Sequence, residues 1–290
     1  MINATHVTKK FGDLVALDNV GLTVETGSIF GLVGSNGAGK STLIRAISGI
    51  YRLDRGSISI DGRDITESPA VRSHLIYVSD DLYFLPNSNM DSMAKLCQNC
   101  RTDFDEKLYA ELAEKFEANR KKPIRTMSKG MKRQAALILA IASKPDILLI
   151  DETFDGLDVI KRHDMKEILC GAVAERGLTV LLATHSMREV DDMCDTIAML
   201  HKGKITLQSE LDEAKTSLCK VQIAFPEDFS QSAVEFDGAK ITDFTKDGTV
   251  ATVIFENDRE QVERELQAKN PLLMNVLPLS LEEVFIYKNR

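Results

Sequence analysis

A glycine-rich loop between an apolar run and a helical pattern constrains the fold of this chain more than any other feature. The apolar run covers residues 28–33, and the helical spacing begins at residue 40. The loop between them consists of Gly34, Ser35, Asn36, Gly37, Ala38, Gly39, Lys40, Ser41 and Thr42. In a strand, loop and helix of this kind, the glycines let successive backbone N–H groups point inward at a polyphosphate.

The residue types in this loop therefore predict a phosphate-binding site. Lys40 would reach the outer phosphates, and the hydroxyl of Ser41 would ligate magnesium. The alternative is a glycine-rich turn with an incidental lysine. That alternative leaves the strand before the loop and the helix after it unexplained.

Further apolar runs predict an α/β fold. Buried strands are expected at residues 74–78, 147–150 and 178–183, with a helix at residues 159–174. Strands that alternate with helices indicate a mainly parallel sheet covered by helices. Between residues 90 and 142 strand patterns are absent and helical spacing replaces them, so we expect a helical subdomain at about residues 85–142.

A change of composition after residue 205 indicates a second domain. Short strands are expected at residues 221–225, 239–244 and 249–255, followed by a helix at residues 259–269. Asp247 and Gly248 lie between the last two strands and predict a hairpin. We therefore expect a main domain at residues 1–214 and a small α/β domain at residues 215–290.

Composition restricts the function. The chain of 290 residues has 36 Lys and Arg against 44 Asp and Glu, a net charge of −8, so it lacks a general basic excess for binding nucleic acid. No apolar run approaches the roughly 20 residues of a membrane-spanning helix. The amino terminus has no signal-peptide pattern, and five cysteines without framework spacing suit a reducing compartment. We expect a cytoplasmic protein that binds no nucleic acid.

Two carboxylates follow the predicted strand at residues 147–150. Ligand chemistry in α/β sheets lies at the carboxyl ends of the strands. Asp151 suits a role in holding magnesium through water, and Glu152 suits a role in orienting or deprotonating an attacking water. The alternative is a pair that caps the following segment, because acidic residues after strands are common.

Together these residues resemble the ABC ATPase family of P-loop NTPases, and two further elements make the resemblance specific. Residues 127–131, with Ser128, Lys129 and Gly130 at their centre, resemble the family signature. The resemblance implies that this helix amino terminus faces the γ-phosphate of a nucleotide held by a second copy. His185 matches the family histidine that contacts the γ-phosphate and the catalytic glutamate. Taken alone, Ser128 would be an ordinary N-cap and His185 a capping or surface histidine.

Smaller matches follow in the same order as in the family. Phe11 lies where the family carries an aromatic residue that stacks on adenine, although a core phenylalanine is the alternative. Residues 156–158 resemble the loop that crosses between two ATP sites. Residues 279–285 resemble the closing segment of ATPases in bacterial exporters of drugs, antibiotics and peptides, whose membrane subunits are separate chains. The alternative there is an amphipathic helix that packs on its own domain.

The resemblance implies an ATP-binding and ATP-hydrolysing subunit of an ABC exporter that uses ATP and Mg²⁺. Two copies, or one copy and a homologous ATPase, would enclose two ATP molecules head to tail. Their closure would drive a polytopic membrane permease subunit from the inner face of the membrane. Glu152 and His185 would be the catalytic residues, and Ser41, Asp151 and Asp80 would face the metal.

Two rival functions fit the sequence less well. A translation or DNA-maintenance ATPase of the same family usually carries two cassettes or a long coiled-coil insertion, and this chain has neither pattern. A small-molecule kinase would use the phosphate loop but would leave Ser128 and His185 unexplained.

Some residues depart from the family pattern. Lys129 replaces the middle glycine of the signature, Met131 replaces its glutamine, and Thr153 replaces the proline after the catalytic glutamate. Lys129 would add positive charge near a γ-phosphate, or it would be a solvated lysine at a helix start.

Asp80 is the departure with the most mechanistic content, because the family normally has a glutamine there. An aspartate in this place is expected to approach magnesium through water while repelling the γ-phosphate. The apolar residues 82–85 that follow are expected to form a docking surface for a membrane partner.

Overall fold

The computed structural model describes residues 1–288 except 102 and 155. The chain divides into two compact units, Met1–Ile205 and Thr206–Arg290. The division lies within strand β10 (Lys204–Glu210), earlier in the chain than the expected boundary between residues 214 and 215. Composition changes near this point, and the strand itself continues through it.

A six-stranded sheet forms the centre of the first unit, with the order β10-β9-β3-β8-β7-β6. Strands β9, β3, β8, β7 and β6 pair in parallel. Every residue of β3, β7 and β8 is buried, and strands covered on both faces appear in a sequence as continuous apolar runs. This explains why the sequence predicted these strands closely. The parallel strands are β3 Ile29–Val33, β6 Leu75–Val78, β7 Ile147–Asp151, β8 Thr179–Thr184 and β9 Thr196–His201, of which β9 was not predicted from the sequence.

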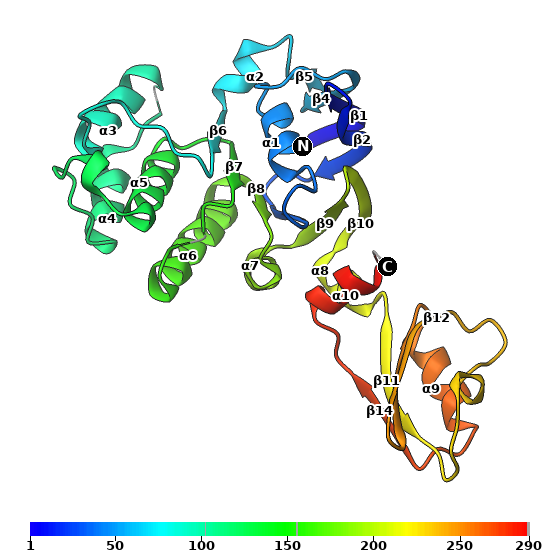
Figure 1. The fold of residues 1–290 in the computed structure, drawn as a ribbon. Helices are drawn as coiled ribbons and strands as arrows, with labels where there is room; N and C mark the ends of the chain where they lie inside the picture. The colour runs from blue at the N-terminus through cyan, green and yellow to red at the C-terminus, as the bar shows by residue number, and fades with distance from the viewer. Residues whose placement is uncertain (102, 155, 289–290) are drawn as a thin grey trace. The chain divides into compact units, whose positions relative to one another are not determined.

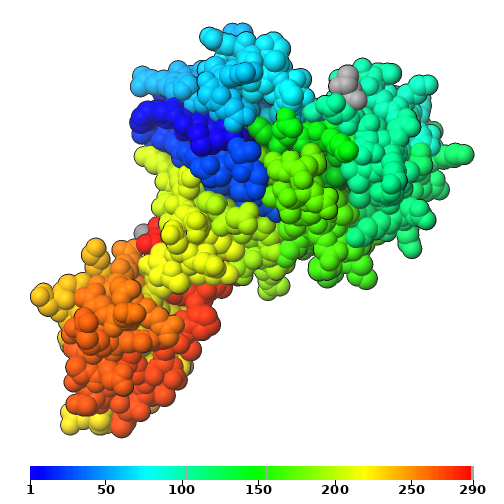
Figure 2. Space-filling view, turned by 180° about the vertical axis from the view of Figure 1, so that it is seen from behind, coloured from blue at the N-terminus to red at the C-terminus, as the bar shows by residue number. Residues whose placement is uncertain are grey.

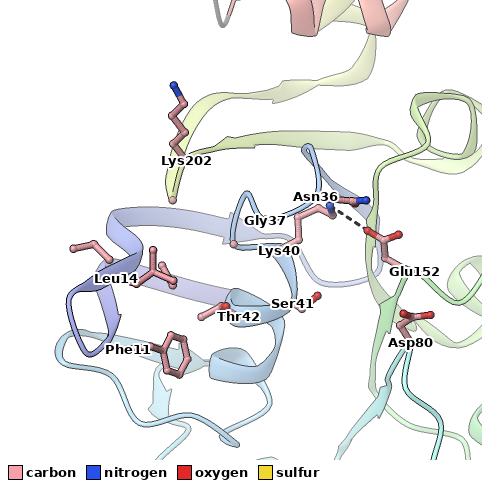
Figure 3. A pocket seen from close by; sticks show the side chains of 14 residues that line it. Phe11, Leu14, Asn36, Gly37, Lys40, Ser41, Thr42, Asp80, Glu152 and Lys202 are labelled. Carbon is pink, nitrogen blue, oxygen red and sulfur yellow. Dashed lines mark ion pairs between the residues drawn. The ribbon is translucent and has the colours of Figure 1, made fainter.

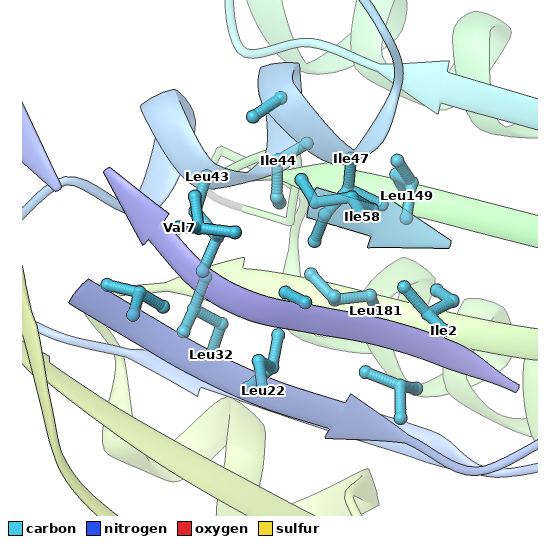
Figure 4. Packing of buried hydrophobic residues seen from close by; sticks show 14 of the residues in the cluster. Ile2, Val7, Leu22, Leu32, Leu43, Ile44, Ile47, Ile58, Leu149 and Leu181 are labelled. Carbon is cyan, nitrogen blue, oxygen red and sulfur yellow. The ribbon is translucent and has the colours of Figure 1, made fainter. Parts of the chain in front are cut away.

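A four-stranded antiparallel sheet, ordered β2-β1-β4-β5, precedes and flanks this core, and the sequence analysis assigned no elements to it. Its strands are β1 Ile2–Phe11, β2 Leu14–Val24, β4 Arg55–Ile60 and β5 Arg63–Asp64. Helix α1 (Lys40–Ile47) packs its apolar face into one buried cluster with both sheets (Figure 4). Leu43 and Ile44 of α1 meet Val7 of β1 and Leu181 of β8 in that cluster. The phosphate loop thus leads into a helix that packs against both sheets.

The predicted helical subdomain is confirmed. Helices α3 and α4 both pack on α5, and Figures 1 and 2 show these residues as a lobe beside α6. Helix α5 begins after its N-cap, Ser128. The remaining helices of the unit connect the strands. The bounds are α2 Pro69–Ser73, α3 Met90–Cys100, α4 Glu106–Lys115, a short 3-10 helix Ile124–Thr126, α5 Lys129–Ala142, α6 Val159–Arg176 and α7 Met187–Met193.

The second unit contains an antiparallel sheet with the order β12-β13-β11-β14. The predicted hairpin is confirmed, because Asp247 pairs with Val250 and Gly248 has a φ of +61° in the turn. Strand β14 was missed because Pro271 and Pro278 flank it and resemble loop residues. The bounds are α8 Leu211–Thr216, β11 Cys219–Ala224, β12 Ile241–Asp247, β13 Val250–Phe255, α9 Arg259–Gln267, β14 Leu273–Leu277 and α10 Leu281–Lys288, with a 3-10 turn at Gln231–Ala233.

Helix α9 covers one face of this sheet through Val262 and Leu266, which are fully buried beside Val221 and Val253. Helix α10 buries Leu281 and Val284 and exposes Ile286. Among the described residues, none of the helices combines the length and apolar character that crossing a bilayer requires.

Candidate functional site

The phosphate loop passes so close to neighbouring backbone that two of its positions require glycine. A Cβ atom on Gly34 would lie 2.3 Å from the carbonyl oxygen of Leu200. A Cβ atom on Gly39 would lie 2.6 Å from that of Ala16, and Gly39 has a φ of +111°, where side chains are disfavoured. The loop is therefore held in place by strands β9 and β2 on either side of it.

The amino terminus of α1 is arranged to receive an anion. No side chain caps this end, and its first turn contains no acidic residue, so its N–H groups and helix dipole remain available to phosphate. Lys40 is only 5% exposed. Its Nζ donates to the carbonyl oxygens of Gly34 at 2.7 Å and Ser35 at 3.2 Å. The backbone of the loop thus holds the ammonium group of Lys40 at the centre of the loop.

Glu152 brings the predicted catalytic groups together. Its φ of 50° is left-handed, a conformation that is uncommon for a glutamate and that clusters at functional sites. This bend at the end of β7 places its carboxylate 3.1 Å from Lys40 Nζ (Figure 3). The other carboxylate oxygen lies 2.6 Å from Nδ1 of His185, at the end of β8. Three residues that are far apart in the sequence therefore meet at the mouth of the loop.

Ser41 and Asp151 form a pair that fits magnesium. The Ser41 hydroxyl donates to Oδ1 of Asp151 at 3.1 Å. Burial raises the pKa of Asp151, and hydrogen bonds from Ser41 and Tyr77 oppose that rise. Hydroxyl and carboxylate oxygens are the ligand types that Mg²⁺ prefers, and the ion when bound would neutralise charge on the phosphates.

A network behind Asp151 involves residues that sequence reasoning missed. The hydroxyl of Tyr77 donates to Oδ2 of Asp151 at 3.1 Å, and Nε of Arg45 donates to the same hydroxyl at 3.3 Å. Arg45 also donates to Tyr51 at 3.3 Å, and the Tyr51 ring meets Phe11 edge-on at 5.4 Å. Burial raises the pKa of Tyr77, so its phenol remains a donor. In the sequence, the only sign of this role is that Tyr77 places a polar hydroxyl near the end of an apolar strand.

The phosphate loop opens into a cleft of about 710 Å³. Phe11 lies in it and is 43% exposed, so the alternative of a core phenylalanine is wrong. Leu14, at 66% exposed, and Lys202 also line the cleft, and no sequence motif identified them (Figure 3). The predicted residues that line it are Phe11, Asn36, Gly37, Gly39, Lys40, Ser41, Thr42, Asp80 and Glu152.

The signature residues lie outside this cleft. Ser128 caps α5, because its Oγ accepts from the backbone N–H of Met131 at 3.3 Å. Ser128 and Lys129 are exposed. A Cβ atom on Gly130 would lie 2.4 Å from the carbonyl oxygen of Gly156, so glycine is required for α5 to pack on the loop after β7. These residues do not complete the chain's own cleft.

Two departures from the family pattern have a structural explanation. Asp80 was expected to face magnesium, but its carboxylate accepts a hydrogen bond from Nη2 of Arg133 and lies 4.0 Å from Nζ of Lys129, both on α5. The cations next to Asp80 attract it toward the helix. The hydroxyl of Thr153 donates to the carbonyl oxygen of Asp151 at 3.0 Å, so this buried side chain is satisfied where the family has proline.

Known proteins have sequences similar to this chain. The family profile described as ABC transporter matches residues 17–155. The ABC transporter ATP-binding protein YtrB of Bacillus subtilis is 33% identical over 99% of this chain and 98% of its own length. Nod factor export ATP-binding protein I of Sinorhizobium fredii is 28% identical over 98% of this chain and 84% of its own. The sulfate/thiosulfate import protein CysA of Mycobacterium tuberculosis is 34% identical over 70% of this chain and 60% of its own.

A solved structure supports the fold class predicted from the sequence. It is described as the ATP-binding subunit of an ABC transporter, and it superposes with a TM-score of 0.68 and 26% identity over 74% of this chain and 92% of its own. The α/β P-loop NTPase core with a helical subdomain is therefore confirmed. With a relative matched along almost its whole length, the chain belongs to the ABC transporter ATP-binding proteins, a family of ATP-hydrolysing subunits.

Proposed function

We propose that this chain is the ATPase subunit of an exporter, and that two copies close head to tail on ATP to drive a separate polytopic membrane permease. The observation that carries the proposal is the contact of Glu152 with both Lys40 and His185 at the mouth of the phosphate loop. Lys40 would bind phosphate, Glu152 would accept a proton, and His185 would orient Glu152.

The chemistry follows from these contacts. A polyphosphate in the cleft competes with Glu152 for Lys40, because its oxygens carry more charge than the carboxylate. Glu152 is then free to orient a water molecule against the γ-phosphate and accept its proton. His185 holds the second oxygen of the same carboxylate, which keeps the base aimed during attack. Ser41 and Asp151 are the residues proposed to hold Mg²⁺.

The exposed signature supports pairing with a second copy. Ser128 and Lys129 are exposed at a helix amino terminus that lies outside the chain's own cleft. At the start of α6, Val159 and Ile160 are 81% and 75% exposed, an unusual exposure for adjacent large apolar side chains. Head-to-tail closure on ATP would place Ser128 over the partner's phosphate loop and cover this apolar pair.

An apolar hollow supports docking of a membrane subunit. It encloses about 330 Å³ between the residues after β6 and the helical subdomain, and Phe84, Met93 and Leu139 line it. Tyr83, at its edge, is 80% exposed. A short helix of a membrane subunit, carrying one or two apolar side chains, would fit such a hollow. The chain would then work at the inner face of the membrane through that partner.

The comparisons support the export direction. The protein named for Nod factor export aligns with 98% of this chain, whereas the named sulfate/thiosulfate importer aligns with 70% of it. Residues 279–285, which resemble the closing segment of exporter ATPases, form much of α10. The transporter names among the relatives that span the chain also favour transport over a translation or DNA-maintenance role.

Purification from detergent-solubilised membranes tests the proposal. A tagged copy of the full chain is expected to retain a polytopic membrane protein, whereas a purely soluble partner would contradict a transport function. Cells that overproduce both proteins should tolerate higher concentrations of at least one antibiotic in a panel of cationic peptides and amphiphilic drugs. Replacing Glu152 with Gln in the same cells should abolish that tolerance, and increased sensitivity with the unaltered pair would argue for import.

A further inference from the structure

Arg133 is a buried cation that needs a counter-charge. Its side chain lies on α5 and is only 3% exposed. Charged side chains are rarely buried without a partner, because removing a cation from water is costly unless an anion compensates it. In the described part of the chain, Asp80 is the one carboxylate that pairs with Arg133.

The other groups around Arg133 do not replace Asp80. Lys129 lies 4.0 Å from the same carboxylate oxygen, but the Lys129 and Asp80 side chains are 73% and 50% exposed, so this contact contributes little. Nε of Arg133 is buried without an acceptor among the described residues. On its other side the guanidinium meets the backbone of Gly156, where a Cβ atom would lie 3.4 Å from Nη1. Among the residues that the structure describes, Asp80 therefore supplies the counter-charge of Arg133.

This pair joins two functional parts of the molecule. Asp80 belongs to the loop after β6 and lines the nucleotide cleft together with Glu152 (Figure 3). Arg133 belongs to α5, little more than one turn beyond its N-cap Ser128. The first turn of this helix also packs closely on the loop after β7, because Gly130 meets the carbonyl of Gly156. The border of the cleft and the signature surface are thus connected by one charge pair.

We propose that Asp80 is a positioning residue that acts through Arg133. Their charge pair holds the signature end of α5 against the loop that borders the cleft, and so couples each copy's own nucleotide site to the surface that it presents to its partner. This inference depends on the head-to-tail pair proposed above. It also explains the aspartate, because a neutral glutamine at position 80 would leave Arg133 without its counter-charge.

A double-mutant cycle tests the pair. Asp80→Gln, Arg133→Gln and the double variant are made in chains that also carry Glu152→Gln, which slows hydrolysis. One measurement is the ATP concentration that gives half-maximal dimer by light scattering. A second is the affinity of a fluorescent ATP analogue for dilute, monomeric chain, and a third is the Mg²⁺ concentration that half-saturates this binding. Asp81→Asn removes the same charge from the exposed neighbouring aspartate and serves as the control.

We expect Asp80→Gln to raise the ATP concentration for dimer formation on the order of 10-fold. Binding to the monomer and the Mg²⁺ midpoint should change by less than about 3-fold, because the Asp80 carboxylate at the border of the cleft pairs with Arg133. The double variant should recover most of the loss, since it removes the uncompensated cation together with its partner. Asp81→Asn should match the parent.

Two outcomes would overturn the proposal. A higher Mg²⁺ midpoint in Asp80→Gln would make Asp80 a metal-facing group, and additive losses in the double variant would show that the two residues act separately. If the Glu152→Gln parent itself does not dimerise with ATP, the head-to-tail function fails instead. Thermal unfolding of the parent, the two single variants and the double variant then still measures the pair. The midpoint temperature of unfolding is expected to fall by several degrees in Asp80→Gln and to recover in the double variant.

Discussion

The two flanks of the nucleotide cleft are built differently. On the phosphate-loop flank, Lys40 and Asp151 are 5% and 1% exposed and are held by several short contacts within the parallel sheet and α1. On the helical flank, Ser128 and Lys129 are exposed, and Asp80 is half exposed and held by one buried arginine. Three departures from the family pattern, Asp80, Lys129 and Met131, lie on the second flank. The first flank carries one of the departures named above, Thr153, whose buried hydroxyl donates to the carbonyl oxygen of Asp151.

The difference shows how burial limits variation. A group fixed between two strands has no space or solvent to compensate a change, so the chemistry there depends on residue type. A half-exposed group in a loop can differ from the family residue where a neighbouring charge compensates it, as Arg133 compensates Asp80.

Replacing Glu152 with Gln should lower ATPase turnover by roughly 100-fold or more while ATP still binds, because the amide keeps the shape and loses the proton acceptor. Phosphate release and fluorescent-nucleotide titration measure the two effects. Glu117→Gln is a matched control, since Glu117 is an exposed glutamate with a similar φ of 52°. Turnover near that of the control would remove Glu152 from the catalytic role.

Replacing Lys40 with Ala should weaken ATP binding by about 10- to 100-fold, because charge-assisted contacts to the phosphates are lost. Calorimetric titration of ATP into the purified chain measures this change. Lys202→Ala removes an ammonium group that also lines the cleft but has a solvent-exposed stem. Similar losses in the two variants would mean that general charge, rather than the loop geometry around Lys40, determines affinity.

Replacing Ser128 with Arg should raise the ATP concentration needed for dimer formation by about 10-fold, because the bulky side chain would occupy the position of the partner's phosphate. ATP binding to the monomer should remain unchanged, in contrast to Lys40→Ala. Light scattering with the Glu152→Gln chain provides the measurement, and Ser232→Arg on the exposed surface of the second unit is the control. A dimer that tolerates the Ser128 change would place association on another surface.

Replacing Tyr77 with Phe should raise the Mg²⁺ concentration for half-maximal ATPase by about 5-fold, because one hydrogen bond that orients Asp151 is lost and such a bond contributes about 1 kcal/mol. Titrating Mg²⁺ at saturating ATP measures the shift. Tyr51→Phe removes a hydroxyl from the same network without touching Asp151 and should cause a smaller shift. Equal shifts would indicate that the whole network acts through Arg45.

Local patterns in the sequence were sufficient for the phosphate-loop flank. Each of its main features can be recognised from a few consecutive residues, because it follows from local backbone geometry and burial. These features are the glycines of residues 34–39, the apolar runs of the buried parallel strands and the carboxylates after residue 150. The antiparallel strands β1 and β2 were missed, since many of their side chains alternate between buried and exposed and give a weaker signal.

Only the tertiary structure decided which distant side chains share a charge or a hydrogen bond. Asp80 and Arg133 are 53 positions apart, and Tyr77 and Asp151 are 74 apart, so neither contact follows from spacing along an element. The sequence by itself determined the family, the phosphate loop and the candidate base. The structure pairs Asp80, which the sequence predicts to face magnesium, with a buried arginine, because pairing depends on where the packed helices bring the chain together.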